Sequence, residues 1–537
     1  MTWLETERAR SRVAAEENTV LLGPGDRLRV CLCYPNTYFV GMSNLGFQTL
    51  YYLLNSLPGV RCERAFMPDE PERSAGPLVS LESQTPVGNF DVVAFSLSFD
   101  LDAVNVPRLL RWAGLPSLAA AREEGPLVIA GGILATFNPE PLAEIVDAFV
   151  IGEAEEIVAP LCEALTPQHT VSRAERLAAL AGMPGVYVPA LYQVEYGAEG
   201  EIAAITPRGS APQEVKRLFV RQLEAWPCHS RVLTQETEFG GLFLVETSRG
   251  CARSCKFCLA GHFYRPQRYR PAAQIIALAQ AGLQFRESIG LIGAAVSDHP
   301  EIERICRELR AAGAKVSLAS LRADRVTPVL LETVVESGAQ SIALAPEAGT
   351  ERLRQAIRKG LSEEQILAAG RAAAGAGLKR LRLYFMVGLP GETAEDVAAI
   401  SQLVREVAAQ GFSRVTVSAC GFIPKPRTAF EREAMAPRKV IRQRLEELRR
   451  ELGATRRVEV SFESPNSSFL QGIISRGDRR LGKVLARLAA GPTAGFADWR
   501  RALAAEGLSG EWYANRERPA KEIAPWELIG REGGEAG

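Results

Sequence analysis

The stretch GLFLVETSRGCARSCKFC, residues 241–258, joins an apolar run to three cysteines within eight positions. The run 242–247 has the composition of a buried strand, and the residues after it are mostly polar, as in a loop. Thiolates are preferred ligands of zinc and of iron–sulfur clusters, and the spacing of Cys251, Cys255 and Cys258 lets one short loop surround a metal. The stretch therefore predicts a metal-binding loop at the end of a strand.

The bulk composition excludes several classes of protein. The chain of 537 residues has 63 Lys plus Arg and 63 Asp plus Glu, so no overall field attracts nucleic acid or an anionic membrane. Its ten cysteines are too sparse for a disulfide scaffold, and no apolar stretch reaches the roughly 18 residues that span a bilayer. We expect a cytoplasmic protein of two or three domains, with no membrane partner and no signal peptide.

Short apolar runs alternate with helical patterns along the chain, which predicts an α/β fold built on parallel sheets. Such runs lie at 28–35, 91–99, 126–132 and 146–156, and then at 242–247, 288–296, 315–320, 340–345, 380–387 and 413–420. The first group indicates a Rossmann-like domain. The second indicates six βα units, as an open sheet or a barrel, with ligands at the carboxyl ends of the strands.

These patterns give the expected domain boundaries. We expect an N-terminal extension (1–27), a Rossmann-like domain (28–205), a charged and proline-flanked linker (206–240), the six-unit domain (241–435) and a C-terminal helical segment (436–537).

The sequence allows two interpretations of the cysteines other than a functional cluster. Three unrelated buried cysteines are disfavoured because the loop is polar. A structural Cys3His zinc site is the stronger competitor, since His262 follows Cys258 by four positions. In that case the chain would be a non-catalytic zinc or iron–sulfur binding module.

The spacing C-x3-C-x2-C, with Phe257 directly before the last cysteine, resembles the signature of radical S-adenosylmethionine (SAM) enzymes. The resemblance implies a partial (β/α)6 TIM-type barrel in which Cys251, Cys255 and Cys258 hold a 4Fe–4S cluster and leave one iron for SAM. It also implies that an electron, supplied by a donor such as flavodoxin or ferredoxin, breaks the sulfonium C–S bond and yields a 5′-deoxyadenosyl radical.

Other strand ends resemble the SAM contacts of these enzymes. In GLIGAAVSDHP, Gly293 stands in the stretch that faces the methionyl amine, although the usual glutamate is missing. In SLRAD, Ser320 and Arg322 are candidates for the methionyl carboxylate, and Glu347 in ALAPEAGT is the candidate for the ribose. Gly388 belongs to the GLPG turn common after the fifth strand. Arg322 as a solvated arginine and Glu347 as a helix N-terminal residue are the plainer alternatives.

Cys420, at the end of the sixth strand, is the candidate catalytic residue. It faces the expected substrate position, where a thiol could supply a hydrogen atom or a covalent link. A small buried hydrophobic role is the alternative.

The N-terminal half resembles the cobalamin-binding-type domain that precedes the barrel in one branch of radical SAM proteins, including the ending GEAEE at 152–156. No histidine occurs before His169, which excludes histidine-ligated cobalamin and leaves a histidine-independent mode open. Methylthiotransferases carry three cysteines for a second cluster in this domain. Here Cys31 and Cys62 are present, but position 96 is a serine.

The whole chain is similar to a family of bacterial radical SAM proteins. From this resemblance we expect the short form of that family, without an extra C-terminal domain. Its flanking domains favour a macromolecular substrate, RNA or protein. Residues 438–457 carry eight Lys or Arg against three Glu, a patch that could hold RNA phosphates or be a solvated helix face. A small-molecule substrate, with methylation as one possible reaction, is the alternative.

Overall fold

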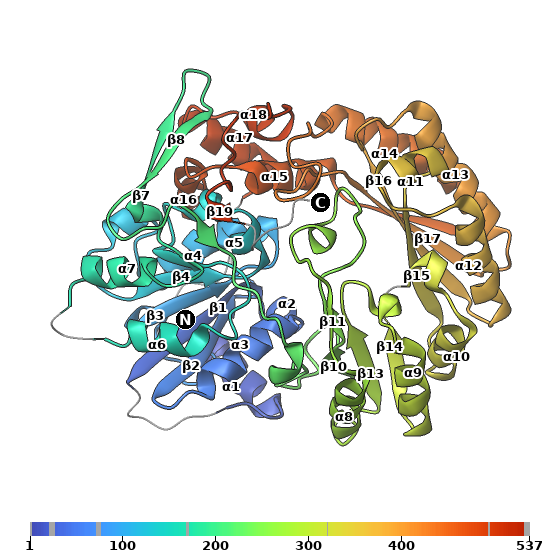
Figure 1. Ribbon diagram of the computed structural model, residues 1–537, viewed down its shortest axis with the longest axis horizontal. Helices are drawn as coiled ribbons and strands as arrows, with labels where there is room; N and C mark the ends of the chain where they lie inside the picture. The colour runs from blue at the N-terminus through green and yellow to red at the C-terminus, as the bar shows by residue number, and fades with distance from the viewer. Residues whose placement is uncertain are drawn as a thin grey trace.

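The computed structural model describes residues 3–20, 27–70, 77–167, 171–318, 321–491 and 494–530. Two sheets lie side by side, each covered by helices, and the C-terminal helices lie at the top, over the N-terminal half and between the two halves (Figure 1). The α/β class predicted from the sequence is confirmed. None of the helices in the described ranges combines the length and apolarity that crossing a bilayer requires.

The N-terminal sheet has the strand order β2-β1-β3-β4-β5-β6, parallel except for the last pair. Its strands are β1 (Leu28–Thr37), β2 (Val60–Met67), β3 (Val92–Ser96), β4 (Leu127–Gly131), β5 (Ala148–Val150) and β6 (Val186–Tyr187). Its helices are α1 (Trp3–Ala15), α2 (Tyr38–Met42), α3 (Leu45–Asn55), α4 (Asn105–Trp112), α5 (Ile133–Phe137), α6 (Val158–Leu165) and α7 (Arg173–Ala181). The order reverses between β1 and β3, which is where doubly wound sheets bind ligands.

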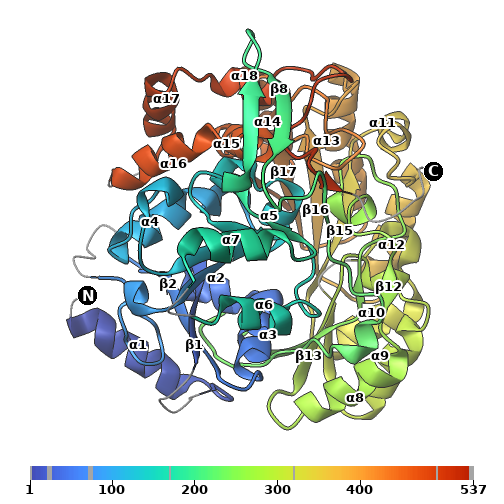
Figure 2. The same cartoon turned by 60° about the vertical axis from the view of Figure 1, so that its left-hand side comes forward.

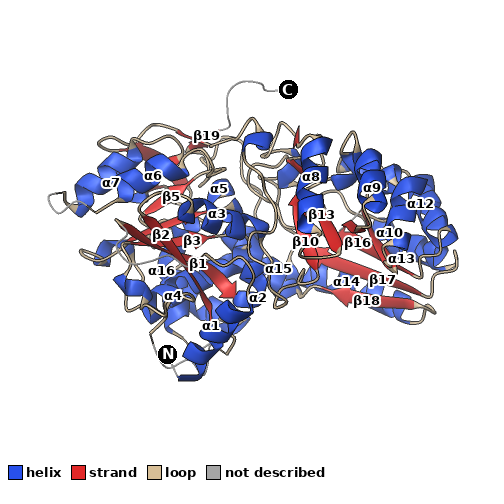
Figure 3. Cartoon of the chain, turned by 90° about the horizontal axis from the view of Figure 1, so that it is seen from below, coloured by secondary structure: helices blue, strands red, loops and turns tan. Residues whose placement is uncertain are grey.

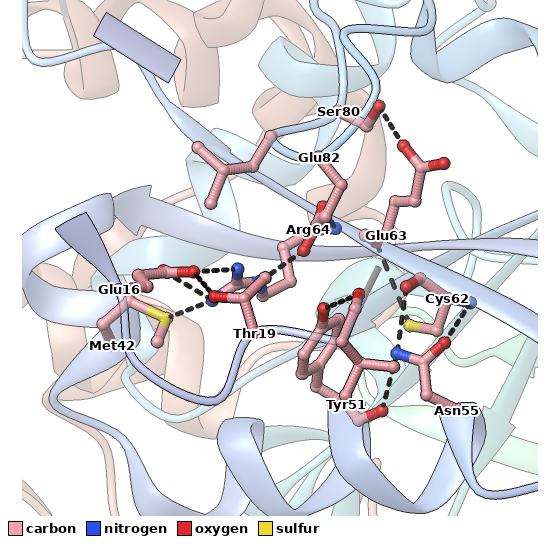
Figure 4. A network of polar contacts seen from close by, with 12 residues as sticks. Glu16, Thr19, Met42, Tyr51, Asn55, Cys62, Glu63, Arg64, Ser80 and Glu82 are labelled. Carbon is pink, nitrogen blue, oxygen red and sulfur yellow. Dashed lines mark hydrogen bonds and ion pairs between the residues drawn. The ribbon is translucent and has the colours of Figure 1, made fainter. Parts of the chain in front are cut away.

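Strand β2 was not among the strands predicted from the sequence, because charged residues interrupt its pattern VRCERAFM. Arg64 is fully buried, and its guanidinium donates to Glu16 at 2.6 and 2.9 Å and to Glu82 at 2.7 Å (Figure 4). It also lies 4.5 Å above the ring of Tyr51. A buried charge is tolerated only when it is paired. Strand β2 can therefore be buried because Glu16, just after α1, and Glu82, in the loop 78–85, pair with Arg64.

The second sheet is a partial barrel in two arcs, β10-β13-β14 and β15-β16-β17-β18, with parallel pairing throughout. The backbone N–H of Leu321 donates to the carbonyl of Ala343 at 3.1 Å and links the arcs. The strands are β10 (Leu242–Glu246), β13 (Ser288–Ile292), β14 (Lys315–Leu318), β15 (Ser341–Glu347), β16 (Arg380–Val387), β17 (Arg414–Gly421) and β18 (Val458–Phe462). The helices are α8 (Ala272–Gly282), α9 (Ile302–Ala311), α10 (Pro328–Glu336), α11 (Glu351–Ala356), α12 (Glu363–Gly375), α13 (Ala394–Ala408) and α14 (Arg438–Gly453).

The barrel continues beyond the boundary expected at residue 435. After α14, strand β18 adds to the sheet beside β17. The helix α14 buries one side, which consists of Ile441, Leu445, Leu448 and Leu452. The C-terminal segment proper therefore begins after β18.

The expected linker 206–240 is packed rather than extended. Within it, β9 (Val215–Lys216) pairs in parallel with β19 (Ile529–Gly530), and Val220 and Leu223 are buried. The physical reason is that its charged residues have partners: Arg217 is buried and lies over the ring of Phe219.

The C-terminal helices join the two halves. They are α15 (Pro465–Arg476), α16 (Leu481–Ala490), α17 (Phe496–Ala505) and α18 (Gly510–Ala514). In Figure 3, α15 lies between the two sheets, and α16 packs on α4. The hairpin of β7 (Tyr192–Tyr196) and β8 (Ile202–Pro207) rises beside these helices (Figure 2), and Arg480 donates to its Gly200 carbonyl at 2.7 Å.

The carboxyl ends of the two sheets face each other. Asp100, which follows β3, accepts from Lys425, which follows β17, at 2.6 Å. Ser475 of α15 completes this buried group, at 2.5 Å from Asp100 and 2.8 Å from Lys425. Side chains at the ligand-binding ends of both domains thus border one common region.

Candidate functional site

The cysteine loop follows β10 and returns through a short antiparallel pair, β11 (Ser248–Arg249) with β12 (Arg268–Tyr269). Backbone hydrogen bonds fold it tightly: Cys251 N–H donates to Ala260, and Cys258 N–H to Cys255, both at 3.0 Å. Cys251 and Cys255 are buried, and Cys258 is half-buried. The three thiols thus belong to one compact loop at the carboxyl end of the first barrel strand.

The loop does not form the Cys3His zinc site that the sequence allows. Within the described ranges, no group of three or more His, Cys, Asp or Glu side chains is arranged to hold a single metal ion. The Nε2 atom of His262 lies 3.0 Å from the carbonyl oxygen of Cys255 and is engaged there. In a 4Fe–4S cluster each cysteine binds a different iron, so the thiols need not converge on one point.

Cations and amides surround the thiols. Burial raises the pKa of Cys255, while the positive charges of Lys359 and Arg322 act to lower it. Burial also raises the pKa of Cys258, against the backbone N–H groups of residues 260 and 261, which favour its thiolate. These groups would stabilise the negative charge that metal-bound thiolates carry.

Small and unpartnered groups beside the loop fit a bound cofactor. A Cβ on Gly293 would lie 2.8 Å from Ser248 Oγ and 2.9 Å from Thr247 Oγ1. Among the described residues, the buried Ser248 Oγ has no hydrogen-bond partner. An unsatisfied buried hydroxyl costs free energy unless a ligand pairs with it, so the residues present fit a polar group bound here.

Glu347 ends β15 in a strained conformation. Its φ of 70° is unusual for a residue with a side chain, and the pairing with β16 shifts register there. The carboxylate accepts from Lys359 at 3.0 Å, and its charge acts on Cys255, Cys258 and Cys420. Glu347 is therefore held at the centre of the site rather than at a helix N-terminus.

The other residues predicted to contact SAM lie in different local environments. Phe257 packs on a small apolar cluster that includes Ala348 and Phe430. Arg322 is bonded to Asp324 at 2.9 and 3.3 Å, so a ligand carboxylate would share or replace that partner. Ser320 lies outside the described residues. Gly388 has φ 83° and donates its N–H to Glu392 at 2.8 Å, which fixes the GLPG turn.

Cys420 is half-buried at the end of β17, beside Met386 in register. Burial raises its pKa to about 12, and the carboxylates of Glu463 and Glu347 act in the same direction. Its thiol is therefore neutral near pH 7. A neutral thiol can donate a hydrogen atom but is a poor nucleophile.

An ion-pair network that sequence reasoning did not assign anchors the cysteine loop to the N-terminal domain. Glu153 accepts from Arg268 at 2.7 and 2.8 Å, and Arg249 contacts Glu155 at 2.6 Å and Glu246 at 2.9 Å. Although burial opposes it, hydrogen bonds from Arg268 and the charge of Arg249 lower the pKa of Glu153. In the sequence, only the GEAEE motif, which contains Glu153 and Glu155, pointed to part of this network.

The cysteines considered for a second cluster lie in the N-terminal core. Cys31 on β1 and Cys62 on β2 are buried, and Cys31 Sγ lies 3.9 Å from Cys33 Sγ. Burial raises the pKa of both Cys31 and Cys62 well above the usual range. They act as core residues.

Family comparisons cover both halves of the chain. Residues 46–189 match "Radical SAM proteins, N-terminal", and residues 245–404 match "Radical SAM superfamily". The second match contains the cysteine loop, Gly293, Arg322, Glu347 and Gly388.

Individual proteins are similar over different lengths. An uncharacterized protein from Methanocaldococcus jannaschii is 29% identical over 464 residues, 85% of this chain and 90% of that protein. A tRNA-2-methylthio-N(6)-dimethylallyladenosine synthase from Sorangium cellulosum is 32% identical over 31% of this chain and 39% of the enzyme. The cobalamin-dependent radical enzyme OxsB has 17% identity and a TM-score of 0.45, over 70% of this chain and 52% of its own. The chain thus spans well under two thirds of the synthase and of OxsB.

Proposed function

Because the chain belongs to the radical SAM superfamily, we propose that this enzyme cleaves SAM reductively at a 4Fe–4S cluster and modifies a macromolecule, RNA or protein. The observation that carries the cluster assignment is the loop that holds the thiols of Cys251, Cys255 and Cys258 together at the carboxyl end of β10. When bound, such a cluster supplies the electron that breaks the sulfonium C–S bond of SAM.

The protein's own residues would bind and orient SAM at this loop. Ser248 and the Cβ-free surface of Gly293 offer a close approach for the methionyl end. Glu347, whose carboxylate accepts a hydrogen bond from Lys359, would accept hydrogen bonds from the ribose hydroxyls. Cys420 would face the substrate as a neutral thiol and hydrogen-atom donor.

A macromolecular substrate is supported by the openness of the barrel and by two relatives. On the inner face of β16, Arg380, Arg382 and Tyr384 are exposed, as is Arg414 at the start of β17, so this part of the barrel wall is accessible to a bulky group. The Sorangium relative is a tRNA-modifying enzyme by name, and a Salinispora arenicola relative, 29% identical over 222 residues, is named a ribosomal protein uS12 methylthiotransferase.

Cysteine substitution tests the cluster assignment. Cys255→Ala should abolish both the charge-transfer absorbance of the reconstituted protein and 5′-deoxyadenosine formation with dithionite and SAM. Cys306→Ala, which removes a buried thiol of α9, is the matched control and should retain both. Zinc without iron in the purified protein, or cleavage retained by Cys255→Ala, would contradict the proposal.

A second candidate is a cobalamin-dependent reaction, including methylation of a small molecule. It is favoured by exposed apolar side chains at the switch point of the N-terminal sheet: Phe39 and Val40 follow β1, and Phe99 follows β3. These could pack against a planar macrocycle without a histidine ligand. A spectral change on adding hydroxocobalamin, lost in Phe99→Asp, would support it; an unchanged spectrum would rule it out.

A further inference from the structure

A row of arginines runs across the first residues of β16 and β17 and the residue that precedes β18. The register pairs Arg380 of β16 with Arg414 of β17. The pairing of Val415 with Val458, and a 2.8 Å bond from Val415 N–H to the Arg457 carbonyl, place Arg457 beside Arg414. Figure 3 shows β16, β17 and β18 side by side. Like charges directly opposite one another on neighbouring strands destabilise a sheet, so an anion bound to this row would stabilise it.

The row has little internal compensation. Arg414 contacts Glu459 at 3.2 Å, with their side chains 51% and 56% exposed. Among the described residues, Arg380 and the next inward residue of its strand, Arg382, form no ion pair. The surface around these arginines therefore keeps a net positive charge, although the chain as a whole is neutral.

These arginines lie on the inner wall of the barrel, not on its helix-covered face. Along β16, Leu381, Leu383, Phe385 and Val387 are buried, whereas Arg380, Arg382 and Tyr384 are exposed. Because side chains alternate in a strand, Met386 continues the exposed face, and it is in register with Cys420. At ~3.3 Å per residue, the path from Arg380 to Met386 is about 20 Å long.

An exposed aromatic ring stands between the arginines and the site. Tyr384 is 39% exposed, whereas large aromatic side chains inside a protein are normally covered. Guanidinium groups that bind phosphates, followed by a ring on which a base can stack, are the elements of single-strand recognition.

We propose that the inner wall formed by Arg380, Arg382, Arg414 and Tyr384 binds single-stranded RNA and leads it toward Cys420. The proposal rests on the proposed function and names RNA as its substrate class. An acidic protein would be attracted by the arginines, but it would not explain the exposed ring in line with them.

RNA binding by the full-length protein tests the proposal. The probe is a fluorescein-labelled, mixed-sequence RNA of about 20 nucleotides, followed by anisotropy between about 50 and 200 mM salt. Each phosphate contact contributes about 0.7 to the slope of log K against log salt. Arg380→Gln with Arg382→Gln should therefore lower that slope by about 1.4, and Tyr384→Ala should weaken binding on the order of tenfold.

The matched control removes the same charge from the outer surface. Arg304→Gln with Arg307→Gln changes two exposed arginines of α9 and should leave RNA affinity within about twofold of the wild type. Far-ultraviolet circular dichroism checks that each variant is folded. RNA affinity unchanged in the Arg380/Arg382 variant would overturn the proposal, as would a wild-type protein that binds polyglutamate but not RNA.

Iron content and 5′-deoxyadenosine formation by the wild-type preparation separate this inference from the proposed function. RNA binding that needs the arginines, in a protein without an iron–sulfur cluster, would refute the enzymatic proposal alone. A wild-type enzyme that cleaves SAM but does not bind RNA would refute the RNA assignment alone.

Discussion

Replacing Glu153 by glutamine should loosen the cysteine loop while both domains stay folded. In the wild type the Glu153 carboxylate accepts two hydrogen bonds from Arg268 and one from the Val220 N–H at 2.8 Å, and it lies 3.5 Å from Arg249. Its side chain is 8% exposed, as is that of Arg268. The change therefore leaves a buried guanidinium without its counter-charge.

The magnitude follows from the burial of this pair. Removing one partner of a buried ion pair costs about 3–5 kcal/mol. Glutamine keeps one acceptor oxygen, and Glu155 and Glu246 still contact Arg249, so we take the lower end, about 3 kcal/mol. That corresponds to an increase of about 100-fold in the population of the open loop.

Hydrogen–deuterium exchange with mass spectrometry measures this opening directly. Peptides from residues 246–270 should exchange about 100-fold faster in Glu153→Gln, and the reconstituted variant should lose iron sooner. Glu156→Gln changes an exposed residue of the same motif and should match the wild type. If loop protection in Glu153→Gln stays within about threefold of the wild type, the network does not hold the loop.

Acid should weaken the same contact. The pKa of Glu153 is lowered in the folded state. Its carboxylate therefore contributes fully to stability at any pH above its pKa in the unfolded chain, about 4.3. This contribution to stability is lost as the pH falls through the lower pKa that Glu153 has in the folded protein.

Two further predictions concern the N-terminal domain. Arg64→Ala leaves the buried carboxylates of Glu16 and Glu82 without their partner. It should lower the free energy of unfolding by about 3 kcal/mol or more, which a lower thermal midpoint would show. Arg29→Ala, at an exposed position, should change the midpoint little, and equal midpoints for the two variants would contradict a stabilising role of the Arg64 network. Burial raises the pKa of Asp102 to about 7, so its contribution to stability falls as pH rises from about 4 to 7. The thermal midpoint of Asp102→Asn, relative to wild type, should therefore rise between about pH 5 and pH 8, and a constant difference would refute the shift.

The sequence predicted those features that depend on neighbours along the chain. Alternating apolar runs gave most of the strands, because burial on both faces of a parallel strand needs a continuous apolar run. It failed at β2, where Arg61, Glu63 and Arg64 hide a buried strand, and at 206–240, where charged residues suggested a linker. In both cases groups distant in the sequence contact the charges: the carboxylates of Glu16 and Glu82 pair with Arg64, and the ring of Phe263 and the carbonyl of Arg265 contact Arg217.

The candidate site divides in the same way. Cys251, Cys255 and Cys258 lie within one loop, so their spacing was sufficient to predict a cluster site. Lys359, which fixes Glu347, and Ser248, whose hydroxyl is unpaired among the described residues, carry no motif that would single them out.

The sequence by itself determined the α/β alternation and the cysteine loop, because periodicity and ligand spacing are local properties of the chain. Only the tertiary structure decided which charges meet. Glu153 and Arg268 are 115 positions apart, and Arg380 faces Arg414 only through the register of two strands. Such contacts depend on how separate elements pack and pair, which no pattern of neighbouring residues specifies.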